Sequence, residues 1–202
     1  MNDTYDKIKF INNLLSNLQK DQNFETSLLQ VSDEMKFSNK LKSKLLNDDY
    51  CEGVDSLISE LNKIINERMK KGKPKNFSKL RINEKIRFFI FYRIKIINNL
   101  FDNKILLNFM LKQKSLIKLN KMLFKISDEI WYSSGDSSTD FNYYTKRFTL
   151  MNIYASSFLF NLKDNSNEFS KTKKFIENQI NYVLRFGRFK SKIKNLFYSK
   201  TI

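Results

Sequence analysis

Residues 144–162 read YTKRFTLMNIYASSFLFNL, and this stretch decides the fold class. Its apolar positions recur at alternating spacings of four and three residues: Tyr144, Phe148, Met151, Ala155, Phe158 and Leu162. Such spacing is that of one face of an α-helix, so we expect a helix with this face turned inward. On that helix Tyr143, Lys146 and Arg147 would then form an outward ridge.

The other long segments show the same helical periodicity, and none alternates as a strand would. We expect helices near residues 8–18, 23–34, 40–46, 57–69, 82–101, 104–111, 115–132 and 169–186, the last with Gly187 placed as its C-terminal cap. A chain of 202 residues with 4 Gly and 1 Pro has few of the turns that β-sandwiches and barrels need. The sequence therefore predicts an all-α protein.

Residues 70–76, KKGKPKN, form a basic linker with both Gly and Pro, and they are the best candidate for a domain boundary. We expect a helix-turn-helix-like head with a connecting helix over 1–69, a helical ligand-binding body over 77–185 and an amphipathic segment over 186–202. A turn at 134–136 should precede the helix containing residues 144–162, with Ser137 and Asp140 forming a capping box.

The composition excludes many catalytic chemistries. There is no His, and Cys51 is the only cysteine, which excludes an internal disulfide, the usual zinc sites and every His-based triad. The carboxylates occur singly or as neighbours such as Asp128 and Glu129. We therefore expect no enzymatic activity, no cofactor and no metal.

Charge is distributed unevenly along the chain. The formal net charge is +16, yet 7 Lys against 11 acidic residues give residues 1–60 a net charge of −4, and residues 61–202 have +20. Residues 182–202 contain six basic side chains and no acidic one, and apolar side chains take the other side of this segment. This pattern predicts an anionic membrane surface as a partner, contacted through Phe186, Phe189, Lys190, Ile193, Lys194 and Phe197. Docking of the same segment on the body as a last core helix is the alternative.

No apolar stretch reaches the length of about 20 residues that spans a bilayer, and no targeting segment is apparent. From these features we expect a cytoplasmic protein, peripheral on the inner face of a bacterial membrane.

One extended run of residues carries a resemblance to a known family. It comprises Trp131-Tyr132, Gly135-Asp136, 138–142, 144–147, Leu150, Ile153-Tyr154 and Ser157, and a second run follows at 175–180. These runs resemble the signature of the COQ9 family, the lipid-binding accessory proteins of ubiquinone biosynthesis. The resemblance is strong over about 120–187 and fainter over 23–57. It implies a TetR-like all-α fold that forms a homodimer.

The resemblance implies a protein that binds an isoprenoid quinone precursor or a phospholipid and presents the precursor to a membrane-associated ring hydroxylase. By position it implies contact with that partner through Asp140, Tyr143, Tyr144 and Arg147. It implies lipid binding through Phe148, Met151, Ala155, Phe158, Phe89 and Trp131. The chain departs from the family at Tyr143, where Trp is usual, and at Gln179, where Arg is usual. A partner contact for Tyr144 also conflicts with its inward placement above.

Two alternatives remain open. A TetR-like transcription regulator with a hydrophobic ligand pocket would need a basic head to offset phosphate repulsion, whereas residues 1–60 have a net charge of −4. Its expected recognition helix, 39–46, does contain Lys40, Lys42 and Lys44. The other alternative is a purely structural helical protein. We expect no nucleic-acid partner.

Overall fold

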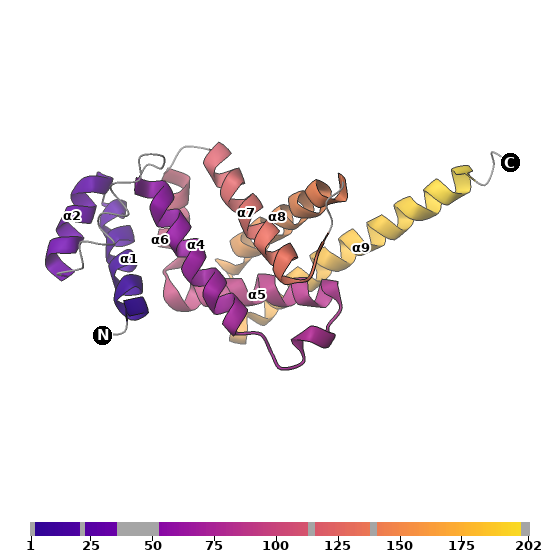
Figure 1. The fold of residues 1–202 in the computed structure, drawn as a ribbon, viewed down its shortest axis with the longest axis horizontal. Coiled ribbons are helices and arrows are strands. Elements are labelled where there is room, and N and C mark those ends of the chain that lie inside the picture. The colour runs from indigo at the N-terminus through magenta and orange to yellow at the C-terminus, as the bar shows by residue number, and fades with distance from the viewer. Residues whose placement is uncertain (1–2, 21–22, 36–52, 113–115, 138–140, 199–202) are drawn as a thin grey trace. The chain divides into compact units, whose positions relative to one another are not determined.

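The protein is described here from a computed structural model, which describes residues 3–20, 23–35, 53–112, 116–137 and 141–198, with side chains at 5–20, 23–35, 53–112, 116–137 and 142–186. The regular elements in these ranges are all helices (Figure 1), so the all-α prediction is confirmed. They are α1 (Asp3–Gln19), α2 (Phe24–Met35), α4 (Gly53–Lys71), η1 (Phe77–Lys79), α5 (Ile82–Leu100), α6 (Asn103–Lys112), α7 (Leu116–Ser133), α8 (Phe141–Asn161), η2 (Asn167–Phe169) and α9 (Ser170–Tyr198). The helix expected at 40–46 lies outside the described residues, as do Cys51 and Asp140.

The chain divides into two compact units, each built from two stretches of sequence. The first comprises Met1–Lys73 and Lys95–Met122, and the second comprises Pro74–Ile94 and Leu123–Ile202. One division point falls in the predicted linker at 70–76, and the other two fall inside α5 and α7.

In the first unit α1 packs against α2 and α6, and α2 packs against α4. Its core consists of apolar side chains with little or no exposure, among them Phe10, Ile11, Leu14, Leu28, Leu57 and Leu106. The Nζ of Lys7 lies 3.0 Å from Oε1 of the buried Glu60, which ties α1 to α4. Burial of an apolar stripe from each helix holds this unit together.

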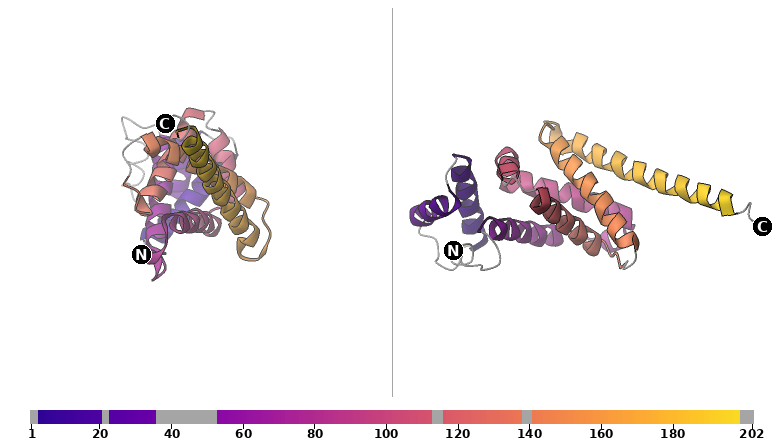
Figure 2. Two further views of the ribbon diagram at one scale, coloured as in Figure 1. Left: turned by 90° about the vertical axis from the view of Figure 1, so that its right-hand side faces the viewer. Right: turned by 90° about the horizontal axis from the view of Figure 1, so that it is seen from above.

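In the second unit α8 packs against α9. The two helices, in orange and yellow, lie close together near the turn that joins them and diverge away from it (Figure 2). The core contains Phe89, Ile90, Ile94, Ile130, Leu150, Tyr154 and Ile176. Arg93 of α5 is only 1% exposed, and its Nε donates to the hydroxyl oxygen of Tyr154 at 3.2 Å.

Asp164 organises the turn between α8 and α9. One carboxylate oxygen accepts from the N–H and hydroxyl of Ser166 at 2.9 and 2.5 Å, and the other accepts from the N–H and hydroxyl of Thr172 at 2.7 and 2.6 Å. This carboxylate therefore satisfies backbone donors at the start of α9, as a helix cap does. Glu168 and Phe169, in the same turn, have positive φ angles of 49° and 55°.

Two sequence-based expectations about helix geometry are wrong. Gly187 does not end the last helix, because α9 continues to Tyr198. The inward face of α8 is also rotated, since Tyr144 and Phe148 are 65% and 61% exposed. The buried side chains of α8 are instead Arg147, Leu150, Ile153, Tyr154, Ser157, Phe158 and Asn161, which share a second helical spacing.

Candidate functional site

The turn between α7 and α8 is built by a glycine. The N–H of Gly135 donates to the carbonyl of Tyr132 at 3.0 Å, and the N–H of Asp136 donates to that of Trp131 at 3.1 Å. This pair of bonds defines a Schellman motif, which needs a left-handed residue at the position of Gly135. The φ of Gly135 is 94°, a backbone conformation that residues with a Cβ rarely adopt. The Gly-Asp pair of the signature therefore ends α7 and fixes the backbone of Asp136.

Arg147 of α8 is held between two carboxylates. Its Nε lies 2.7 Å from Oδ1 of Asp128 on α7, and its Nη1 lies 3.0 Å from Oδ2 of Asp136 in the turn. The guanidinium also stacks on the ring of Tyr143, 3.4 Å from the ring centroid. Since Arg147 is 3% exposed, this set of contacts forms a buried clamp that joins α7, the turn and α8.

Hydrogen bonding in this clamp shifts two pKa values. The phenol of Tyr143 donates to Asp128 at 2.9 Å, and this bond, with desolvation, raises the pKa of Tyr143. Burial disfavours the charge on Arg147, but its hydrogen bonds to Asp128 and Asp136 outweigh that effect and raise the pKa of the guanidinium. Arg147 thus stays cationic and Tyr143 stays a neutral donor at physiological pH.

Lys146 and Trp131 form a second contact across the same two helices. The indole Nε1 of Trp131 donates to the carbonyl of Lys146 at 3.1 Å, and the Lys146 ammonium lies 5.3 Å from the indole ring centroid. The same ammonium pairs with Oδ1 of Asp136 at 2.8 Å. These contacts position both side chains at the edge of a pocket.

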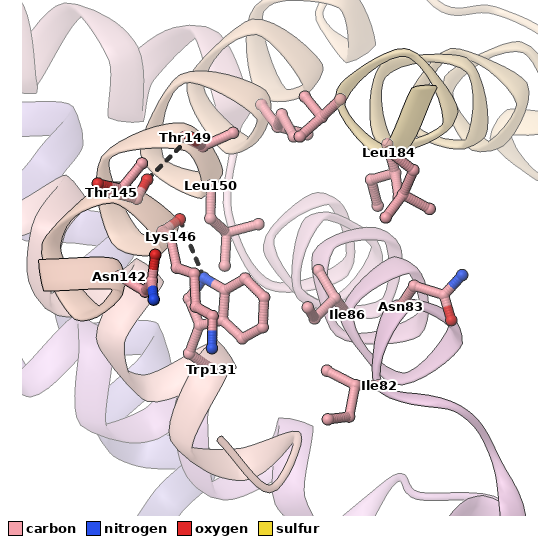
Figure 3. A pocket seen from close by; sticks show the side chains of 13 residues that line it. Ile82, Asn83, Ile86, Trp131, Asn142, Thr145, Lys146, Thr149, Leu150 and Leu184 are labelled. Carbon is pink, nitrogen blue, oxygen red and sulfur yellow. Dashed lines mark hydrogen bonds between the residues drawn. The ribbon is translucent and has the colours of Figure 1, made fainter. Parts of the chain in front are cut away.

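That pocket has a volume of about 410 Å³ and lies within the second unit. It is surrounded by α5, α7, α8 and α9 (Figure 3). Its lining consists of Ile82, Asn83, Ile86, Trp131, Asn142, Thr145, Lys146, Thr149, Leu150, Ile153, Ile180, Val183 and Leu184. The volume falls in the usual range of small-molecule sites, about 300–1,000 Å³.

Apolar and polar groups occupy different parts of the pocket. Ile86, Leu150, Ile153 and Ile180 are between 2% and 7% exposed and form an apolar base. Asn142, Thr145, Lys146 and Thr149 come from the first part of α8, and one further polar side chain, Asn83, comes from the start of α5. A surface of this kind suits an amphiphile with an apolar body and a polar end.

The structure places the predicted lipid-binding residues in four different settings. Trp131 lines the pocket. Phe89 is fully buried in the core, with its ring 4.9 Å from that of Phe77. Phe148 is exposed, and Phe158 is 9% exposed. Met151 and Ala155, on the same helix, are half-buried.

The predicted partner-binding residues also separate. The outward ridge is wrong for Arg147, because the two carboxylates and Tyr143 enclose it. Tyr143 is half-buried, and Tyr144 is 65% exposed. The two rings contact each other edge to face, with centroids 5.1 Å apart. Asp140 lies outside the described residues.

Of the predicted membrane-binding residues, only the side chain of Phe186 is described, and it is 61% exposed. Phe189, Lys190, Ile193, Lys194 and Phe197 lie on the continuous backbone of α9, and their side chains are outside the description. In the part of the chain that is described, no helix is both long and apolar enough to cross a bilayer.

The sequence pattern missed Asp128 and most of the pocket lining. Asp128 had a detectable signal, because a Tyr and an Arg spaced four residues apart on one helix can meet a carboxylate on a neighbouring helix. No such signal exists for the pocket isoleucines, because an isoleucine in a pocket wall and an isoleucine in a core give the same apolar pattern. These residues are Ile82, Ile86, Ile153 and Ile180.

Residues 117–187 match the COQ9 family model, so the resemblance found in the sequence is confirmed for this part of the chain. Over 74 residues the chain is 36% identical to "Ubiquinone biosynthesis protein COQ9, mitochondrial" of Rattus norvegicus, which covers 37% of this chain and 24% of the relative. It is 42% identical over 67 residues to COQ9-A of Xenopus laevis, which covers 33% and 21%. The chain thus spans about a quarter of the length of these relatives.

The fold resembles that of a solved TetR transcriptional regulator from Nitrosomonas europaea. The two structures superpose with a TM-score of 0.59 over 87% of this chain and 97% of the regulator, at 16% sequence identity. The prediction of a TetR-like all-α fold is therefore confirmed. At this identity the likeness concerns the fold alone.

The expected location is wrong. The sequence suggested a cytoplasmic protein on the inner face of a bacterial membrane, whereas the relatives from rat, Xenopus laevis and Schizosaccharomyces pombe are named mitochondrial proteins.

Proposed function

We propose that this chain is a non-catalytic lipid-binding accessory protein of ubiquinone biosynthesis. The observation that carries the proposal is the apolar pocket, most of whose lining belongs to the segment that matches the COQ9 family. Trp131, Leu150 and Ile180 all belong to that segment and line the pocket. The relatives with the same segment are named ubiquinone biosynthesis proteins.

The ligand that best fits the pocket is an isoprenoid quinone precursor, with a phospholipid as the competing occupant. A prenyl chain consists of branched apolar units that suit the buried isoleucines at the base. A ring with oxygen substituents would meet a polar wall formed by Lys146, Thr145 and Thr149. The Thr149 hydroxyl donates to the carbonyl of Thr145, so its oxygen can accept a hydrogen bond from a ring hydroxyl.

Mass spectrometry of lipids extracted from the purified protein tests this assignment. We expect an isoprenoid quinone precursor or a phospholipid in the wild type. Thr149→Trp should lose it, because the indole would fill the pocket that Thr149 lines. Leu159→Trp is the matched control on the same helix, since Leu159 is 52% exposed and outside the pocket. A wild-type protein that is consistently empty would contradict the proposal.

Presentation of the precursor to a membrane-associated ring hydroxylase is part of the same proposal. Tyr143 and Tyr144 support it, because an edge-to-face tyrosine pair beside a pocket is the kind of surface on which binding energy concentrates. Arg147 acts in this scheme as a positioning residue, since it stacks under Tyr143 while itself enclosed. Affinity capture of the hydroxylase from membranes tests the contact.

The basic C-terminal segment is proposed as a membrane contact, and the natural location as mitochondrial like that of the named relatives. Deleting residues 188–202 should strongly weaken co-sedimentation with anionic vesicles and leave the helicity of the remaining chain nearly intact. If the shortened chain binds vesicles as well as the full chain does, the C-terminal segment is not a membrane contact. Subcellular fractionation tests the location.

A homodimer is proposed by analogy with the TetR-like fold, and light scattering of the purified protein tests it. The acidic net charge of residues 1–60 argues against a regulator that binds DNA.

A further inference from the structure

A rigid cationic loop leads into the pocket. Residues 72–81 connect α4 to α5, and the side chains of Lys75, Lys79 and Arg81 are exposed. Ile82, which begins α5, lines the pocket directly after this loop. We refer to Lys75, Lys79 and Arg81 as the basic loop.

The loop is held in shape by its own contacts. Phe77 is 8% exposed and packs against the rings of Phe88 and Phe89, at 5.5 and 4.9 Å between centroids. The N–H of Arg81 donates to the carboxylate of Glu84 at 2.8 Å, as in a capping box. An anchored loop presents its cations without a large loss of conformational entropy.

The rim of the pocket beside this loop is apolar and exposed. Ile82 is 46% exposed, and Val183 and Leu184 of α9 are 37% and 40% exposed. Figure 3 shows Ile82 and Leu184 at the side of the pocket where α5 and α9 approach each other. Arg87 of α5 donates to Asn181 of α9 at 2.5 Å, a bond that joins the two helices.

Exposed cations beside exposed aliphatic side chains match the chemistry of a bilayer interface. Cations there attract anionic head groups, while aliphatic side chains enter the acyl boundary. In the described part of the chain, no carboxylate forms an ion pair with the side chain of Lys75, Lys79, Arg81 or Arg185. A nucleic acid would use the cations and have no use for the aliphatic rim.

We propose that the mouth of the pocket lies against an anionic membrane surface. The basic loop and the aliphatic rim, formed by Ile82, Val183 and Leu184, make the contact with that surface. A lipid then moves between bilayer and pocket without crossing water. This inference rests on the proposed lipid-binding function and adds a contact separate from the segment 186–202.

Co-sedimentation of the full chain with vesicles tests the proposal. The variant Lys75→Gln, Lys79→Gln, Arg81→Gln should bind vesicles of phosphatidylcholine and phosphatidylserine about 100-fold more weakly than the wild type, at about fivefold for each cation. Ile82→Ser should weaken binding about tenfold with no change of charge. Binding of the wild type to pure phosphatidylcholine vesicles should be weak.

The matched control is Lys171→Gln, Lys173→Gln, Lys174→Gln, which removes three exposed cations from the start of α9 in the same unit. Lys174 and Val183 are nine residues apart, or about 13 Å along the helix, which exceeds the screening length. We expect this control to bind within about threefold of the wild type. Equal losses in the two triple variants would overturn the proposal, because net charge alone would explain them.

Lipid extraction separates this proposal from the proposed function. The basic-loop variant should retain the co-purified lipid of the wild type, because its pocket is unchanged. If the wild type contains lipid but the basic-loop variant binds vesicles as well as the wild type does, the proposed membrane contact is overturned and the lipid-binding function is not. If the wild type contains no lipid but its vesicle binding still depends on the basic loop, the lipid-binding function is contradicted and the membrane contact is not. If the protein binds duplex DNA through the basic loop and Ile82→Ser does not weaken that binding, the assignment of this surface to a membrane is overturned.

Discussion

The Nη1 of Arg147 lies 3.0 Å from Oδ2 of Asp136, and the two side chains are only 4% and 5% exposed. Breaking such a buried pair from one side leaves an uncompensated charge, whereas the intact pair contributes little net stability. The pair therefore fixes the geometry of the turn between α7 and α8 and keeps Tyr143 in place. Its expected consequences concern both stability and partner binding.

Arg147→Met should lower the free energy of unfolding by about 1–3 kcal/mol, because the buried Asp136 would lose one of its two cationic partners and keep only Lys146. The double variant Asp136→Asn, Arg147→Met should regain a large part of that loss, since no buried charge is left. Chemical denaturation measures all three proteins. Arg81→Met, at an exposed position, should stay within about 0.5 kcal/mol of the wild type. A double variant no more stable than the single one would contradict this account of the pair.

Gly135→Ala should destabilise the protein by about 1–2 kcal/mol. The cause is the φ of 94°, since no atom lies within 4 Å of a Cβ built at this position. Gly135→Asn should lose less, because Asn adopts the left-handed region more readily. Thermal unfolding of the two variants checks the order, and an alanine variant as stable as the wild type would exclude backbone strain as the reason for glycine here.

Much of this fold was predictable from the sequence. Periodicity located α5 and α7 almost to the residue, because long helices repeat their apolar pattern many times. One division point of the two units, after Lys73, falls in the linker expected at 70–76 from its Gly and Pro, although α4 continues to Lys71.

The orientation of α8 was not predictable in the same way. Its sequence contains two helical stripes of similar spacing, one through Phe148 and one through Leu150. The second contains Arg147, a residue that rarely enters a core unless it is paired. The pairing depends on Asp136, and Asp136 is placed by the Schellman motif at Gly135. A periodicity analysis of one segment contains none of that tertiary information.

The pH dependence of stability should reflect Asp164, whose pKa is lowered from 3.8 to about 2. Burial raises this pKa, and the hydrogen bonds from Ser166 and Thr172 outweigh that effect. A lowered pKa means that the stabilisation is fully present above pH 4 and is lost as the pH falls through 2. Its size is about 2 kcal/mol.

The variant Asp164→Asn tests this assignment. It should lose about 2 kcal/mol at neutral pH and show a smaller decrease in stability on acidification than the wild type. Asp102→Asn is a suitable comparison, because Asp102 accepts N–H bonds at the start of α6 in an exposed position. Denaturation curves at several pH values supply the data, and parallel profiles for the wild type and Asp164→Asn would show that another group controls the acid limb.

The raised pKa of Tyr143 predicts a late phenolate transition in an alkaline titration followed by ultraviolet absorbance. The hydrogen bond to Asp128 is the main cause, followed by desolvation. Asp128→Asn should therefore move the transition to lower pH. The Tyr143→Phe variant identifies which transition belongs to this residue. No movement in Asp128→Asn would show that the 2.9 Å bond does not control the phenol.

Partner binding can be tested separately from folding at the exposed Tyr144. Tyr144→Ala should reduce capture of the ring hydroxylase from membranes by tenfold or more, because aromatic side chains at the centre of an interface typically contribute about 2 kcal/mol. Its free energy of unfolding should change by less than about 0.5 kcal/mol, since Tyr144 is 65% exposed. Arg147→Glu should lose both properties, because it disrupts the pair with Asp136 and the stacking under Tyr143. Tyr182→Ala, at a 71% exposed tyrosine of α9, is the matched control and should retain both. If Tyr144→Ala captures as much hydroxylase as Tyr182→Ala does, the tyrosine pair is not the docking surface.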